Sequence, residues 1–230
     1  MGEQVVKELP KQRSGASQRI QRRLQQLTTW RERTERIVEQ TKQVLGGNPH
    51  VKNRLVSLFD PDARPIRKGK VKVAAGTEFG YKVVVADDER GFVTDYDVTS
   101  GNPEDSTLLK ASVERHIERV GHAPKGVAVD RGMASAGNDR ALADLGVERR
   151  SLPKTGKKNA TEQAKERAWW FRRLQRFRAG GEGRISLLKR KYGWRRSRLR
   201  GLDGTKTWVG WGVITHNLVK YARFELAAVA

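Results

Sequence analysis

Hydrophobic positions recur with two different periods along this chain of 230 residues, and the change of period predicts how it is organised. Between residues 16 and 45 apolar positions alternate four and three residues apart, which predicts one long helix. Gly46-Gly47-Asn48-Pro49 ends the pattern, because glycine and proline terminate helices. Arg31, Thr34 and Thr41 interrupt the apolar stripe, so this helix is expected to need a partner that covers it.

From residue 51 onwards short apolar runs replace the helical period. The run 55–59 is strand-like, 60–65 is rich in turn-forming residues, 67–72 is expected to be an exposed loop, and 81–86 with 91–98 predicts a hairpin. The remaining elements are expected as a helix at 105–120, a strand ending at Asp130, a helix at 136–145, a strand at 148–152, and helices at 160–176, 180–192 and 206–226. This order predicts a mixed α/β sheet with its strand tips on one edge.

Charge and composition narrow the class of partner. The formal net charge is +21, which favours nucleic acid because each neutralised phosphate releases condensed counterions. An anionic membrane surface is the other candidate, although no stretch approaches the 18 apolar residues of a membrane span. There is no apolar region of a signal peptide after Met1, so a cytoplasmic, nucleoid-associated protein is expected. The absence of cysteine excludes disulfides, thiolate zinc sites and cysteine nucleophiles.

Two carboxylates have the context of a catalytic site. An apolar run over 126–129 places Asp130 at the end of a strand. Glu182 follows Arg178 by four residues and precedes Lys189 by seven, so on a helix the three lie within about 40° of one stripe. A strand-end Asp and a helical Glu beside cations are suited to two-metal phosphoryl transfer on DNA. A basic amphipathic helix with one solvated Glu has the same spacing, so the spacing alone leaves both interpretations open.

The segment around Glu182 is strongly basic. Twelve Lys and Arg residues lie between positions 172 and 200, interleaved with aromatic residues, which favours a surface that follows phosphates over a solvated helix face. The cations expected to contact DNA phosphate are Arg178, Lys189, Arg190, Arg195, Arg196, Arg198 and Arg200. Gly180, Gly181 and Gly183 each cost a helix interior roughly 1 kcal/mol. They either let DNA approach Glu182 closely or delay the start of the helix.

Other residues that could carry chemistry have a structural interpretation. The tryptophans 169, 170, 208 and 211 are expected in the core, and His216-Asn217 is expected to be a buried, hydrogen-bonded pair. The carboxylates around the hairpin are expected on the surface; they are Asp87, Asp88, Asp95 and Asp97.

Several motifs together resemble the DDE-type transposases of bacterial insertion sequences. The resemblance covers roughly residues 50–220 and is specific only in combination. The motifs are Ser57-Leu58-Phe59-Asp60-Pro61-Asp62-Ala63-Arg64-Pro65-Ile66-Arg67-Lys68-Gly69, Glu78-Phe79-Gly80-Tyr81-Lys82-Val83, Gly101-Asn102-Pro103, Val129-Asp130-Arg131-Gly132, Gly181-Glu182-Gly183-Arg184-Ile185-Ser186-x₂-Lys189-Arg190-x-Tyr192-Gly193-Trp194, Thr207-Trp208-Val209-Gly210 and His216-Asn217-Leu218.

The resemblance implies a ribonuclease H-like catalytic domain that cuts transposon ends and joins the freed 3′-hydroxyls to target DNA. It implies that Asp130 is the second acid, that Glu182 is the third, and that both bind Mg²⁺ or Mn²⁺. Arg178 and Lys189 match the family's cations on either side of the Glu. Double-stranded DNA and a second copy of the chain on that DNA are the implied partners.

Two departures qualify the resemblance. Gln175 occupies the place where the family often has a tyrosine. The first acid is expected upstream, on a strand that a long helical insertion follows, so 1–50 is assigned to a helical arm and 51–230 to the C-terminal part of the catalytic domain. This predicts a split or truncated transposase whose sheet lacks its central strand. Asp60 and Asp62 are alternative first acids, although Asp-Pro-Asp more simply shapes a turn.

Overall fold

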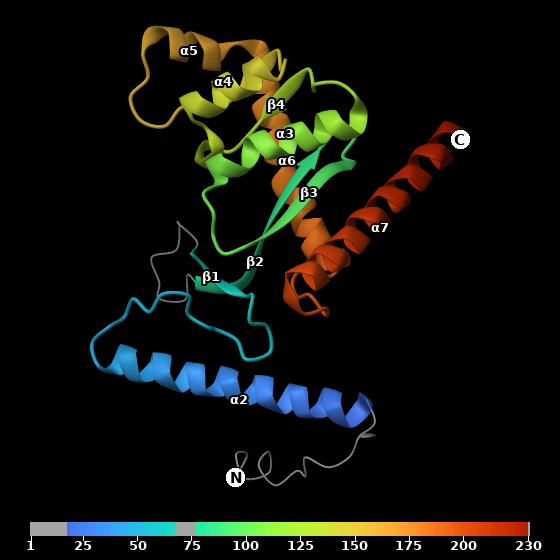
Figure 1. Cartoon of the computed structure of the whole chain (residues 1–230). Helices are drawn as coiled ribbons and strands as arrows, with labels where there is room; N and C mark the ends of the chain where they lie inside the picture. The colour runs from blue at the N-terminus through green and yellow to red at the C-terminus, as the bar shows by residue number, and fades with distance from the viewer. Residues whose placement is uncertain (1–17, 68–76, 230) are drawn as a thin grey trace.

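The structure is a computed structural model that describes residues 18–67 and 77–229, and it is mixed α/β as the periodicity predicts (Figure 1). Its elements in chain order are α2 (Gln18–Leu45), β1 (Arg64–Arg67), β2 (Thr77–Asp87), β3 (Val93–Ser100), α3 (Asp105–Val120), β4 (Gly126–Ala128), the 3₁₀ turn η1 (Arg131–Met133), α4 (Ala136–Asp144), β5 (Arg149–Ser151), α5 (Ala160–Arg167), α6 (Trp169–Lys191) and α7 (Gly201–Val229). Arg67 belongs to β1, and the rest of the loop predicted at 67–72 lies outside the described residues.

The strands form two small sheets. β1, β2 and β3 make an antiparallel sheet that contains the predicted hairpin, with Val83 opposite Val98. β4 and β5 make a parallel pair. The sequence predicts one mixed sheet, whereas no strand pairing joins the two sheets within the described residues. β4 and β5 are short because Asp130 turns into η1 just after β4, and Pro153, which lacks an N–H for a ladder, follows β5 closely.

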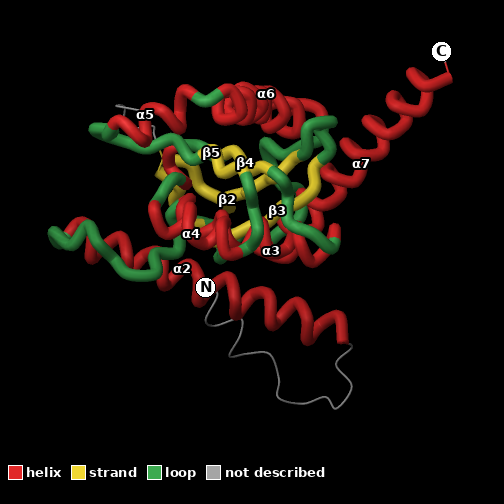
Figure 2. The backbone as a smooth tube through the Cα atoms, turned by 90° about the horizontal axis from the view of Figure 1, so that it is seen from above, coloured by secondary structure: helices red, strands yellow, loops and turns green. Residues whose placement is uncertain are grey.

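Helices cover both sides of the strands. Figure 2 shows α6 on one side, with α3 and α4 on the other. The main core lies beneath α3 and α4 and consists of Leu109, Val113, Val129, Leu142 and Val147. A second cluster, Val93, Leu188 and Val213, joins β3 to α6 and α7. Since the burial of apolar area drives folding, the second cluster fixes α6 to β3 and α7. Helix α6 also packs on β4 and β5, next to Asp130.

A buried carboxylate fastens α3 to β3. Asp95 is 1% exposed and accepts hydrogen bonds from Ser112 Oγ at 2.9 Å, Arg115 Nη2 at 2.8 Å and Arg119 Nη1 at 2.8 Å. The hydrogen bond to Asp95 is the main cause that raises the pKa of the Arg115 guanidinium. The prediction of a surface position for Asp95 is wrong, because α3 covers that side of the hairpin and supplies all of these donors.

The predicted long helix is present as α2, but the predicted strand at 55–59 is wrong. The backbone of this segment bonds to side chains of α2 instead of to another strand. Gln40 donates to the Leu55 carbonyl and accepts from the Leu55 N–H at 2.7 Å, and Arg33 donates to the Leu58 carbonyl at 2.8 Å. The C-terminal half of α2 is therefore held by this segment, whereas Ile20 and Leu27 remain about half exposed.

The boundary between the two helices before Tyr192 differs from the prediction. The chain breaks at Ala168, where the backbone is extended, and α6 then runs without interruption through Gly180 and Gly183. The inner face of α6 buries Phe171 and Leu188. Packing along this face compensates for the low helix propensity of the glycines. The periodicity of the sequence alone does not show this compensation.

Helix α7 is anchored by the predicted pair and then extends beyond the rest of the molecule (Figure 1). His216 is buried and bonds to the Gly91 carbonyl, while Asn217 pairs with both the N–H and the carbonyl of Val93. Two tryptophan predictions are wrong, since Trp169 and Trp211 are each 63% exposed on the outer sides of their helices. No described helix combines the length and the apolar character that a membrane span requires.

Candidate active site and DNA-binding surface

Asp130 lies at the tip of β4, immediately after the buried Val129. Its backbone is extended, and its carboxylate accepts the N–H of Arg131 at 2.7 Å, which caps η1. The Asp130 side chain remains 68% exposed. The strand thus fixes the backbone while the carboxylate stays accessible to a ligand.

Glu182 is brought to the same place by α6. Arg178 lies one turn earlier on that helix and contacts both acids: its Nη1 is 3.1 Å from Asp130 Oδ1 and its Nη2 is 3.4 Å from Glu182 Oε1. The Arg178 side chain is 26% exposed, whereas that of Glu182 is 78% exposed. Two carboxylates from distant segments therefore share one guanidinium, and both keep oxygens that face solvent.

Gln175 holds the two strand ends beneath these carboxylates. Its amide nitrogen donates to the Ser151 carbonyl at 2.9 Å and to the Val129 carbonyl at 3.5 Å, and it also contacts Ser151 Oγ at 2.9 Å. Ser151 is fully buried and donates its hydroxyl to the Phe171 carbonyl. The sequence marks Gln175 only as the residue that replaces a tyrosine. Its position three residues before Arg178, on the inner side of α6, is the signal for this role.

Asp60 and Asp62 are engaged in other contacts. Asp60 accepts the Tyr81 hydroxyl at 2.5 Å, and Asp62 accepts the Leu202 N–H at the start of α7 at 3.4 Å. Burial is the main cause that raises the pKa of the Tyr81 phenol, and the hydrogen bond to Asp60 raises it further. Within the described part of the chain, no group of three or more His, Asp or Glu side chains could hold a metal ion.

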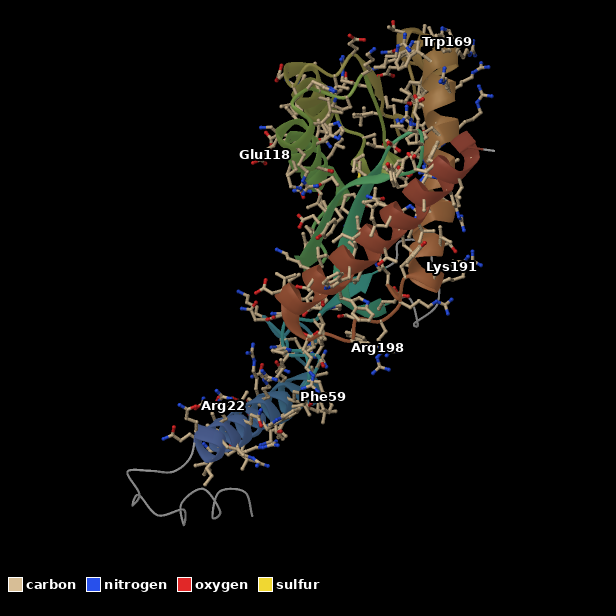
Figure 3. All side chains as sticks on the ribbon, turned by 90° about the vertical axis from the view of Figure 1, so that its right-hand side faces the viewer. Arg22, Phe59, Glu118, Trp169, Lys191 and Arg198 are labelled. Atoms are coloured by element: carbon tan, nitrogen blue, oxygen red, sulfur yellow. The ribbon has the colours of Figure 1, made fainter. Side chains whose placement is uncertain are left out.

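The predicted phosphate-binding cations extend from the end of α6 into the connection that follows. Lys189 and Arg190 are exposed on the last turn of α6, and Arg195, Arg196 and Arg198 are exposed beyond it. Arg200 is also exposed and places its guanidinium over the ring of Phe59, 5.7 Å from its centre. Figure 3 shows Lys191 and Arg198 in succession along one edge of the molecule. These cations form a continuous basic segment beyond Glu182.

The glycines near Glu182 have no packing role inside the protein. A Cβ at Gly183 would meet no neighbouring atom within 4 Å, and at Gly180 or Gly181 it would meet only the guanidinium of Arg184 at 3.4 Å or more. All three lie inside α6, where each glycine costs roughly 1 kcal/mol relative to alanine. The interpretation that they delay the start of the helix is wrong.

Comparison with known proteins gives one match. The family model of the transposase DDE domain matches residues 49–218, which include both carboxylates and all of the predicted phosphate-binding cations. No curated protein matches the chain, and no solved structure matches it.

Proposed function

Because the chain belongs to the transposase DDE domain family, we propose that it cuts transposon ends and joins the freed 3′-hydroxyls to target DNA. The family makes transposition the process and DNA the substrate. The finer proposal concerns the chemistry, in which Asp130 and Glu182 serve as metal-binding carboxylates. We further propose that the domain is ribonuclease H-like and that its central strand comes from outside the described residues.

The observation that carries the proposal is the contact of Arg178 with both acids. Asp130 and Glu182 come from different elements, yet one guanidinium lies within 3.4 Å of a carboxylate oxygen of each. Exposed ion pairs contribute little to stability, so an arrangement of this kind is poorly explained as structural support. It is well suited to holding two carboxylates at a distance that a bound phosphate and a cation can share.

The carboxylates of Asp130 and Glu182 provide part of the set of ligands that Mg²⁺ or Mn²⁺ needs. Carboxylate oxygens are the ligands these ions prefer, and the remaining positions suit water and substrate phosphate oxygens. When bound, the ion would polarise a phosphoryl oxygen and lower the pKa of a coordinated water. Two carboxylates do not complete a two-metal centre, and no third lies with them among the described residues. We therefore propose that a further carboxylate from outside this described set completes the site.

The protein's own residues have separate roles in this proposal. Arg178 orients both carboxylates before the metal binds, and Gln175 holds the strand ends on which Asp130 depends. Lys189 follows Glu182 by seven residues, so it lies about 10 Å further along the same side of the helix. It binds the phosphate next to the one that reacts, and Arg190 binds beside it. Fixed cations of this kind position the DNA before reaction.

A second candidate function is DNA binding without cleavage. The observation in its favour is that the described residues bring together two carboxylates instead of three. In this case the basic segment would bind duplex DNA, and the chain would need another polypeptide to become active or would be inactive. The two candidates share a substrate and differ in metal-dependent chemistry.

The direct test measures metal binding and cleavage separately. Mn²⁺ binding to the purified 230-residue chain is followed by the electron paramagnetic resonance signal of the free ion, for wild type, Asp130→Asn and Glu182→Gln. We expect each substitution to abolish binding, while Glu118→Gln on the exposed side of α3 leaves it unchanged. Equal binding by all four proteins would exclude Asp130 and Glu182 as the metal ligands.

Cleavage is then measured on duplexes that cover the DNA on both sides of the gene. We expect the chain alone to bind DNA with little Mg²⁺- or Mn²⁺-dependent cleavage, and to cut when a polypeptide that supplies the further carboxylate is added. Robust cleavage by the chain alone, abolished by Asp60→Ala or Asp62→Ala, would show that one of these residues is the first acid. Tighter binding of an RNA duplex at the same salt would argue against DNA as the substrate.

A further inference from the structure

Helix α6 has an outer face that no other part of the described chain covers. We define it by the residues that recur every seven positions, Trp169, Arg176, Gly183 and Arg190, together with Arg172. Successive members of the repeat differ in direction by about 20°, so they form one gently turning line about 31 Å long. All five are exposed, whereas Phe171 and Leu188 on the opposite side are buried.

The cations of this face lack partners. Arg172, Arg176 and Arg190 form no ion pair within the described residues, and the neighbouring Arg173 has only a 3.7 Å contact with Glu89. Other cations in the neighbouring segments do form ion pairs. Lys154 and Lys158 each lie 2.5 Å from a glutamate of α5. Unpaired cations aligned on a helix repel one another, so this arrangement is explained by a polyanion that neutralises them.

The helix backbone between two of these cations is uncovered. Gly183 lies midway between Arg176 and Arg190, and the space above it is open. At the far end, the Trp169 ring is exposed with the guanidinium of Arg149 over it, 5.4 Å from its centre. An aromatic ring combined with a cation accepts a base or sugar face, and bare backbone allows a phosphate chain to come close.

We propose that the sugar–phosphate backbone of duplex DNA lies along the outer face of α6, so that its phosphates meet Glu182 at the edge of this face. The proposal rests on the proposed function and adds the path of the DNA, which the basic segment after α6 does not define. In Figure 3, Trp169 and Lys191 mark the two ends of α6, and Arg198 lies beyond Lys191 along the same edge. The outer face would therefore continue into the basic segment.

The first test removes charge from the face. Affinity of the full chain for a labelled 30-base-pair duplex is measured by fluorescence anisotropy at several salt concentrations. For Arg172→Ala/Arg176→Ala we expect the slope of log K against log salt to become shallower by about 1.8, and affinity near 0.15 M salt to fall about 30-fold. The matched control, Lys110→Ala/Arg140→Ala, removes the same charge from α3 and α4 on the opposite side and should change the slope far less.

The second test adds bulk without changing charge. We expect Gly183→Leu to weaken binding about fivefold or more, the equivalent of at least one lost phosphate contact near 0.15 M salt. Its melting temperature should stay the same or rise, because leucine favours a helix more than glycine does. Ala111→Leu, at an exposed position of α3, adds bulk elsewhere and should bind like wild type.

The outcomes separate this inference from the proposed function. Salt-dependent binding by wild type that neither the Arg172/Arg176 pair nor Gly183→Leu weakens would overturn the path along α6 and leave the DNA substrate in place. A wild-type chain that binds no DNA would overturn both. Weaker binding by Gly183→Leu in a folded protein would support the path, since an internal structural role predicts no such effect.

Discussion

Arg178 Nη1 lies 3.1 Å from Asp130 Oδ1, which connects the tip of β4 to the middle of α6. Because the same guanidinium also reaches Glu182, Arg178 is the residue through which the two proposed metal ligands influence each other. Replacing Arg178 by glutamine removes the cation that lies between the two carboxylates.

For Arg178→Gln we expect tighter metal binding. Removing the cation leaves two neighbouring carboxylates unneutralised, so Mn²⁺ should bind up to about fivefold more tightly, since exposed charges about 4 Å apart interact by roughly 1 kcal/mol. Stability should change by less than about 1 kcal/mol, because both acids are largely exposed. Free Mn²⁺ and urea unfolding are the measurements. Arg173→Gln is the control, and weaker Mn²⁺ binding by Arg178→Gln would contradict the charge argument.

Asp95 should be essential for stability. It is 1% exposed, and its replacement by alanine would leave Arg115 and Arg119 without their shared carboxylate. Loss of a hydrogen-bond partner that is charged costs about 1.5–3 kcal/mol, and solvent reaches the two arginines that remain. We expect Asp95→Ala to lower the free energy of unfolding in urea by this amount. Asp97→Asn is a useful comparison, because Asp97 is one-third exposed and 3.7 Å from Arg115, and it should cost less than about 1 kcal/mol.

The phenol of Tyr81 should ionise at a higher pH than that of an ordinary tyrosine. Burial and the hydrogen bond to Asp60 raise the pKa of the Tyr81 phenol, so the fold stabilises its neutral form. This contribution is complete below the ordinary tyrosine pKa of about 10, and it is lost as the pH rises through the folded-state value.

Absorbance at 295 nm during an alkaline titration measures this behaviour. A late phase of the absorbance change, at high pH, should be present in wild type and absent in Tyr81→Phe. Tyr221→Phe, which removes a ring that is 57% exposed, is the control and should leave the late phase in place. Ionisation of all the tyrosines in one early phase would show that Asp60 does not hold Tyr81 in solution.

The basic segment after α6 should set much of the salt dependence of DNA binding. Replacement of Arg195, Arg196, Arg198 and Arg200 by alanine should make the slope of log K against log salt shallower by up to about 3.6, if each binds one phosphate. Fluorescence anisotropy over a range of salt concentrations measures the slope. An unchanged slope would place the DNA on another surface of the chain.

The sequence by itself determined the elements with strong periodicity, and it indicated the residues that we propose for the chemistry. The 4-3 spacing of apolar positions identifies α2, and the alternating pattern around 87–90 identifies the β2–β3 hairpin, because both depend on local geometry. Asp130 and Glu182 are recognisable from the apolar run before one and the cations around the other. His216 and Asn217 are likewise identifiable as a buried polar pair.

Only the tertiary structure decided which groups come together. The segment 55–59 has the composition of a strand, but side chains of α2, Gln40 and Arg33, occupy backbone groups that a neighbouring strand would otherwise bond. Asp95 is buried because α3 brings two arginines to it. The approach of Asp130 to Arg178, the cross-link by Gln175 and the uncovered outer face of α6 depend in the same way on contacts between distant segments. The periodicity of apolar residues indicates which side of a helix or strand is apolar. It does not indicate which other element of the fold will cover that side.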